Sequence, residues 1–214
     1  MKKIYVGVAL LFFLLSFCPC ALGQQGKGPA SADTQAHDTH SGQTKEADTT
    51  INQGNGEAER VQADKHYYGK GATQSFTEAH KLYLKGAEQG NVASQSMLGF
   101  LYYYGQGVSQ DYTEATQWFR KAAEQGNAAS QGMLGMAYYF GEGAPQSYKT
   151  AAKWFRKAAA QEDALSLGML GVMYDKGQSV TQNYKKAAEW YKKAVAQGND
   201  SVQPLLDKVL EKIK

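Results

Sequence analysis

The chain has 214 residues, 43% of them hydrophobic, and a formal net charge of +3 at neutral pH. This charge is too small for the general positive field that favours nucleic acid, so we expect no nucleic-acid partner. Both cysteines, Cys18 and Cys20, lie near the start, and the remaining chain has no thiol for a disulfide or a thiolate metal site.

Residues 1–23 have the pattern of a secretory signal peptide. Lys2 and Lys3 precede an uncharged apolar run, and Ala21 and Gly23 occupy the small-residue positions before a cleavage site. The apolar run is short for a membrane-spanning helix. Cleavage after Gly23 predicts a periplasmic or secreted protein without stable membrane insertion.

A lipoprotein is the alternative, because Cys18 and Cys20 lie at the end of the apolar run. Phe17 and Pro19 precede these cysteines, however, where lipid modification would need a small residue. The residues before the two cysteines therefore favour a soluble exported chain over a lipoprotein.

Residues 24–61 contain almost no large apolar side chains and are expected to form a disordered linker. His37 and His40 have a spacing compatible with a metal ion, but no further ligand type is held near them. We therefore expect no metal or other cofactor.

The remaining chain repeats itself with a period of 36 residues. Tryptophan recurs in register at Trp118, Trp154 and Trp190, and leucine recurs at Leu98, Leu134 and Leu170. A fixed period without insertions is typical of a solenoid, in which each unit buries its apolar face against its neighbours.

Each unit is expected to be an antiparallel pair of helices. The first helix covers about residues 93–104 and ends at Gly105, and a glycine-containing connector follows it. The second helix begins after Asp111, which together with Glu114 forms a capping-box pattern.

The pattern from Ser94 to Gly126, with its LG, GxGV, WF and KAAxQG elements, resembles the Sel1-like repeat, a relative of the tetratricopeptide repeat. The resemblance implies an all-α, right-handed α-solenoid. The expected units are a truncated first repeat at 62–90, repeats at 91–126, 127–162 and 163–198, and a C-terminal capping helix at 199–214. Glu162 and Ser179 replace glycines of the pattern, which puts the local turn geometry in doubt there but not the fold.

One face of each first helix carries aromatic and small residues where an ordinary exposed helix would carry charged ones. The resemblance implies that this face lines a concave groove where partners bind, and clustered aromatic residues are typical protein-binding anchors. The alternative is that the curved solenoid buries part of this face. The predicted groove residues are Tyr67, Ser96, Phe100, Tyr103, Tyr104, Gly132, Met136, Tyr139, Phe140 and Val172.

Two other recurring features are interpreted as structural. Trp118, Trp154 and Trp190 recur with alanine-rich packing positions, which favours core or groove-edge packing over an aromatic binding ladder. Basic clusters such as Arg120–Lys121 are interrupted by acidic residues, which favours a solvated outer face.

Catalytic patterns are missing from the repeat region. It contains only His66 and His80 as histidines, no HExxH spacing and no GxSxG motif. The sequence therefore predicts a non-enzymatic, monomeric interaction module that binds a protein or peptide. The alternatives are a protein that binds the cell wall, through peptidoglycan or β-lactams, and a purely structural stack whose ends meet other copies.

Overall fold

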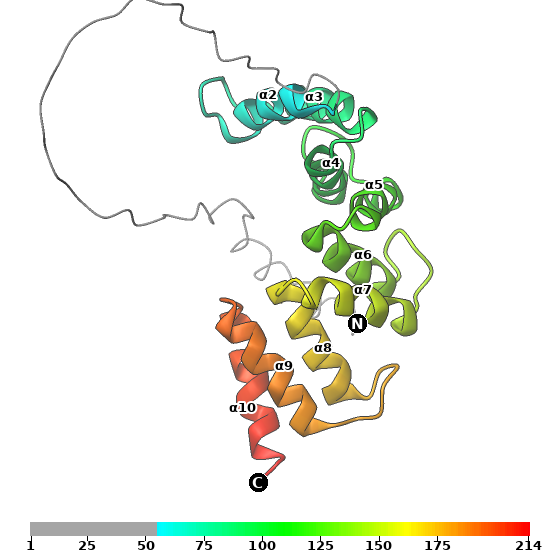
Figure 1. The fold of residues 1–214 in the computed structure, drawn as a ribbon, viewed down its shortest axis with the longest axis vertical. Coiled ribbons are helices and arrows are strands. Elements are labelled where there is room, and N and C mark those ends of the chain that lie inside the picture. Colours follow the sequence, from blue (N-terminus) through cyan, green and yellow to red (C-terminus); the bar gives the residue numbers. More distant parts are fainter. Residues whose placement is uncertain (1–54) are drawn as a thin grey trace, which may run out of the picture. The chain divides into compact units, whose positions relative to one another are not determined.

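The structure, a computed structural model, describes residues 55–214; the predicted signal peptide and most of the predicted linker lie outside this range. All regular structure in residues 55–214 is helical (Figure 1). The helices are α2 (Glu57–Tyr68), α3 (Phe76–Glu88), α4 (Val92–Tyr104), α5 (Tyr112–Glu124), α6 (Ala128–Phe140), α7 (Tyr148–Ala159), α8 (Ala164–Lys176), α9 (Tyr184–Ala196), the short 3₁₀ helix η1 (Asp200–Val202) and α10 (Gln203–Glu211).

The helices form consecutive hairpins that stack in chain order. The hairpins are α2/α3, α4/α5, α6/α7 and α8/α9, each packed against the next, and α10 packs on α9 (Figure 1). The first helices α4, α6 and α8 also contact one another, more extensively than the second helices do. This arrangement confirms the α-solenoid with a C-terminal helix. The placement of the first helices along a concave groove stays a prediction, and so does the handedness.

The recurring leucine–glycine pair has a packing role within each hairpin. A methyl group at Gly99, Gly135 or Gly171 would lie only 2.5 to 2.6 Å from an aromatic ring of the second helix. The rings belong to Phe119, Phe155 and Tyr191, which are fully buried. Glycine at this position therefore lets the two helices approach closely.

Polar side chains fix the helix starts. Asp111 accepts hydrogen bonds from the backbone N–H of Thr113 and Glu114 at 2.8 and 3.0 Å, which confirms the predicted cap of α5. Asn91 caps α4 and Asp163 caps α8 in the same way. Each cap satisfies N–H groups that have no partner within their own helix.

The first hairpin begins earlier than expected. Helix α2 starts at Glu57, inside the segment assigned to the linker, and its 12 residues make it almost as long as the other first helices. The prediction failed here because α2 packs on one side only and buries just Ala63 completely. Its helical pattern is therefore mainly polar.

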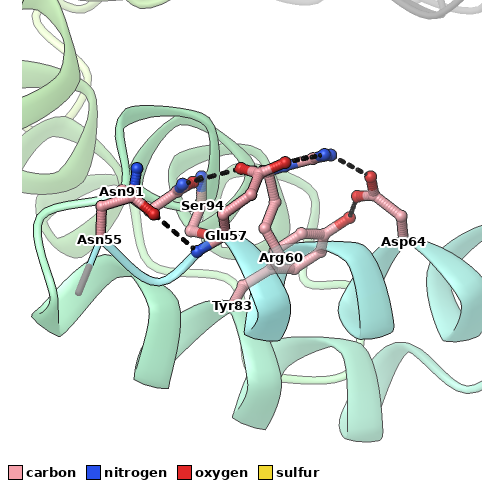
Figure 2. A network of polar contacts seen from close by, with 7 residues as sticks. All are labelled: Asn55, Glu57, Arg60, Asp64, Tyr83, Asn91 and Ser94. Carbon is pink, nitrogen blue, oxygen red and sulfur yellow. Dashed lines mark hydrogen bonds and ion pairs between the residues drawn. The ribbon is translucent and has the colours of Figure 1, made fainter. Parts of the chain in front are cut away.

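A polar network holds α2 against its neighbours (Figure 2). The Arg60 guanidinium contacts Glu57 and Asp64, and it lowers the pKa of Glu57. Asp64 in turn accepts a hydrogen bond from the hydroxyl of Tyr83 in α3 at 2.6 Å, and Asn91 donates to Glu57 at 3.2 Å. The network thus joins α2 to α3 and to the start of α4.

The two departures from the repeat pattern keep the turn geometry of the pattern. Glu162 has φ 61° and Ser179 has φ 60°, in the left-handed region that glycine occupies in the other repeats. Both turns therefore keep the conformation of the pattern, because the surrounding helices hold the two residues in it.

Candidate partner-binding surface

The predicted groove residues lie on the first helices but differ widely in accessibility. Ser96, Gly132, Met136 and Tyr139 are buried, and only Tyr104 is clearly exposed, at 39%. The remaining five are half-buried: Tyr67, Phe100, Tyr103, Phe140 and Val172.

A repeated hydrogen bond accounts for the tyrosines. Tyr67 donates to Gln106 at 3.2 Å, and Tyr139 donates to Gln178 at 2.6 Å. Tyr103 has the equivalent contact with Glu142 at 3.4 Å. Each acceptor lies 39 residues further on, in the connector of the next repeat. These tyrosines therefore link consecutive repeats.

The connectors are also tied to their own first helix. Gln110 donates to the backbone carbonyl of Tyr103 at 2.8 Å, and Gln146 donates to that of Tyr139 at 2.9 Å. The sequence pattern did not predict these hydrogen bonds of the connector residues. Their recurrence at the same 36-residue period as the tyrosines was the available signal.

The small residues of the predicted groove are involved in packing. Ser96 accepts a hydrogen bond from Ser130 at 2.9 Å. A methyl group at Gly132 would lie 3.0 Å from Asp163 Oδ1 and Ser166 Oγ. The next repeat therefore occupies the space beside Gly132, and no room is left there for a partner. Burial at this junction raises the pKa of Asp163.

Phe100 and Tyr104 stack on this face, and Tyr104 is its one exposed aromatic side chain among the predicted groove residues. Their rings are nearly parallel, with centroids 6.3 Å apart, and Phe100 also packs edge-on against buried Phe119. Partial burial raises the pKa of Tyr104 to about 12, so its hydroxyl remains a hydrogen-bond donor at neutral pH. Phe140 stands one repeat further on at the position of Tyr104. We call Phe100, Tyr104 and Phe140 the aromatic surface.

The tryptophans lie on the second helices, whereas the aromatic surface lies on the first helices. Each is half-buried and carries a lysine amino group over its ring, at 3.7 Å for Lys121, 4.4 Å for Lys157 and 4.9 Å for Lys193. Trp118 also packs against the core of the first two hairpins. This contact agrees with a packing role.

Within residues 55–214 no group of three or more His, Cys, Asp and Glu side chains could hold a metal ion. His80 lies 3.2 Å from the hydroxyl of Tyr102, and burial lowers the pKa of His80. In the same described range, no helix has the length and apolar character needed to cross a membrane.

The family model of the Sel1 repeat matches residues 66–91, 92–127, 128–163 and 164–199, and the chain belongs to this family. The last three matched units start one residue later than the predicted ones, at the first helical residue instead of the cap, whereas the first starts at residue 66, four residues after the predicted start at 62. Sel1 repeats are generally non-catalytic modules for protein–protein interaction. No curated protein matches the chain.

Two solved structures are similar over most of the chain. One is c5321, a protective antigen present in uropathogenic Escherichia coli strains, with 37% identity and a TM-score of 0.68 over 72% of this chain and 33% of that one. The other is a Sel1 repeat protein from Oxalobacter formigenes, with 33% identity and a TM-score of 0.66 over 74% and 65% of the two chains. This chain thus aligns with a third of the first relative and just under two thirds of the second.

Proposed function

We propose that the protein is an exported, monomeric, non-catalytic adaptor that binds a peptide or protein on the inner side of its first helices. The observation that carries this proposal is the stacked pair of half-buried Phe100 and exposed Tyr104, on a helix face where exposed positions ordinarily carry charged side chains. Aromatic residues of this kind are common binding anchors because they bury a large area and lose little side-chain entropy.

The proposal assigns different roles to the predicted groove residues. Tyr67, Tyr103 and Tyr139 hold consecutive repeats together, so they shape the surface. The aromatic surface provides the anchors. This division supports testing the function with Phe100 and Tyr104, because substitution of buried Tyr139 would also disturb the fold.

Export is supported by the sequence pattern of residues 1–23 and by the description of one similar protein as a protective antigen. Mass spectrometry of the protein from its native host should find a mature chain that begins after Gly23. A mature chain that still carries residues 1–23 would contradict export by cleavage.

The binding test is crosslinking in the native host followed by capture of the full chain. The variant Phe100→Ala/Tyr104→Ala should lose the specific protein partners of the parent. The matched control is Val61→Ala/Leu205→Ala, which removes two exposed apolar side chains from other surfaces and should keep these partners. Circular dichroism checks that both variants fold.

Two outcomes would contradict the adaptor function. If the folded Phe100→Ala/Tyr104→Ala variant captures the same proteins as the control, the aromatic surface is not the binding site. If purified peptidoglycan retains the parent and no protein is captured specifically, the cell-wall alternative is favoured instead.

A further inference from the structure

A pocket of about 510 Å³ lies between the ends of α7 and α9 and the start of α8. Leu167 and Trp190 contribute apolar surface to it, and Arg156, Lys193, Glu162 and Gln197 contribute polar side chains. No residue of the aromatic surface lines this pocket. The pocket is therefore separate from the aromatic surface and lies mainly between second helices.

The pocket lies where a repeated contact is broken. At the two preceding junctions a glutamine pair joins the hairpins: Gln125 donates to Gln95 at 2.7 Å. Likewise, Gln161 donates to Gln131 at 2.9 Å. At the third junction Leu167 replaces the accepting glutamine, and Gln197 instead donates to Glu162 at 3.1 Å. An apolar side chain therefore stands where the accepting glutamine stands in the other repeats, and Leu167 is only 3% exposed.

Glu162 is a second departure at the same junction. Glycine stands at this turn position in the other repeats, with φ of 87°, 96° and 84° at Gly90, Gly126 and Gly198. A non-glycine residue held in this region stores backbone strain, and such strain tends to occur at functional sites. Two departures from the repeat thus meet at one pocket.

The helices that flank the pocket are strongly basic. Helix α7 has four basic and no acidic residues, and α9 has four basic residues and one glutamate, which gives charges of +4 and +3. Helices α3 and α5 each have two basic and two acidic residues, with His80 neutral, and carry no net charge. The basic side chains of α7 and α9 are all exposed: Lys149, Lys153, Arg156, Lys157, Lys185, Lys186, Lys192 and Lys193.

Arg156 also differs from its counterpart one repeat earlier. Arg120 donates a hydrogen bond to the hydroxyl of Tyr138 at 2.8 Å, whereas Arg156 lines the pocket. Lys193 lies over the ring of Trp190, with its amino group 4.9 Å from the ring centroid. Two cations therefore lie beside an apolar recess.

We propose that this pocket binds an acidic peptide segment of a partner protein, with an apolar side chain seated against Leu167 and Trp190. Carboxylates that flank this side chain would be contacted by Arg156 and Lys193, which provides charge-assisted hydrogen bonds. A nucleic acid or an anionic polysaccharide would match the charge of α7 and α9 but has no apolar side chain to fill the recess. The carboxylate of Glu162, which also lines the pocket, would repel a ligand that carries a continuous run of anions.

The test uses the full chain and a fluorescent peptide in which one phenylalanine is flanked by acidic residues. Binding is measured by fluorescence anisotropy. Leu167→Gln restores the glutamine of the other repeats and should replace apolar surface of the recess with an amide that can pair with Gln197, so we expect the affinity to fall at least about tenfold. Arg156→Gln/Lys193→Gln should give a similar loss, which decreases as salt is added.

The matched control is Arg120→Gln/Lys121→Gln, which removes the same charge from α5, beside a junction that a glutamine pair closes. This control should bind the peptide as the parent does. Thermal unfolding confirms that each variant folds, and Leu167→Gln introduces a residue that the fold already accepts at Gln95 and Gln131.

Three results would overturn the proposal. One is equal peptide binding by the parent and by folded Leu167→Gln. Another is equal binding of the peptide with serine in place of phenylalanine, which would mean diffuse charge attraction. The third is a higher affinity for duplex DNA or for vesicles of anionic lipid than for the peptide.

Discussion

Two buried tyrosines occupy equivalent positions in the first and last hairpins but differ in their hydrogen bonds. Tyr83 donates to the carboxylate of Asp64 at 2.6 Å. The hydroxyl of Tyr191 is buried and has no hydrogen-bond partner in the described part of the chain. Phenylalanine stands at the equivalent positions Phe119 and Phe155, so the fold accepts a ring without a hydroxyl there.

This contrast predicts opposite effects of the same substitution. Tyr83→Phe should lower the free energy of unfolding by about 1 to 3 kcal/mol, because it removes a hydrogen bond to a charged group and leaves Asp64 with one donor fewer. Tyr191→Phe should leave stability unchanged or raise it by about 1 kcal/mol, because it removes a buried unpaired hydroxyl. Urea unfolding of both variants measures the difference. A marked loss for Tyr191→Phe would show that its hydroxyl is paired in solution.

Among the helices and their connectors, a glycine of the connector is needed most where the connector packs against a neighbouring hairpin. Gly71 and Gly143 occupy the same connector position and both have positive φ, at 81° and 71°. A methyl group at Gly143 would overlap the backbone carbonyl of Tyr112 at the start of α5. A methyl group at Gly71 would have no heavy atom within 4 Å.

We therefore expect Gly143→Ala to be much more destabilising than Gly71→Ala. Both substitutions place alanine in the left-handed region, which costs about 1 to 2 kcal/mol. Gly143→Ala must also push α5 away from the connector, which should add about 1 to 3 kcal/mol. Equal unfolding midpoints for the two variants in urea would mean that the connector does not pack against α5 as described.

The helix pairs and their order could be predicted from the sequence, because leucine, glycine and tryptophan recur at one period. The sequence did not predict that α2 begins as early as Glu57, because the first turns of that helix make polar contacts, such as the ion pair between Arg60 and Glu57. It predicted Tyr139 as a groove residue, but not its bond to Gln178. One-dimensional periodicity shows which positions are equivalent, whereas the partner of each position depends on how successive hairpins stack.

For the molecule as a whole, the C-terminal helix covers the last hairpin. Leu206 and Val209 of α10 are buried, whereas the adjacent Leu205 is 37% exposed. Lys212 forms an ion pair with Asp175 at 3.0 Å, and Asp175 stands where the other first helices have tyrosine. Helix α10 thus provides the contact that a further repeat would otherwise supply.

Loss of this cover should loosen the stack from one end. Leu206→Ala should cost about 2 to 4 kcal/mol through lost burial and the cavity left behind. In a solenoid each hairpin depends on its neighbours, so the loss should be concentrated in α8–α10. Hydrogen–deuterium exchange should therefore show weaker protection there and unchanged protection in α2–α5.

Leu205→Ala is the matched control, because it removes the same side chain from the exposed side of α10 and should change the free energy of unfolding by less than about 0.5 kcal/mol. The distribution of the exchange tests the coupling between hairpins. If Leu206→Ala weakened protection equally from α2 to α10, the stack would unfold as one cooperative unit, and the cover by α10 would stabilise every repeat. Protection lost only near the C-terminal hairpin would mean that the inner repeats, with Phe100 and Tyr104, remain folded when that end opens.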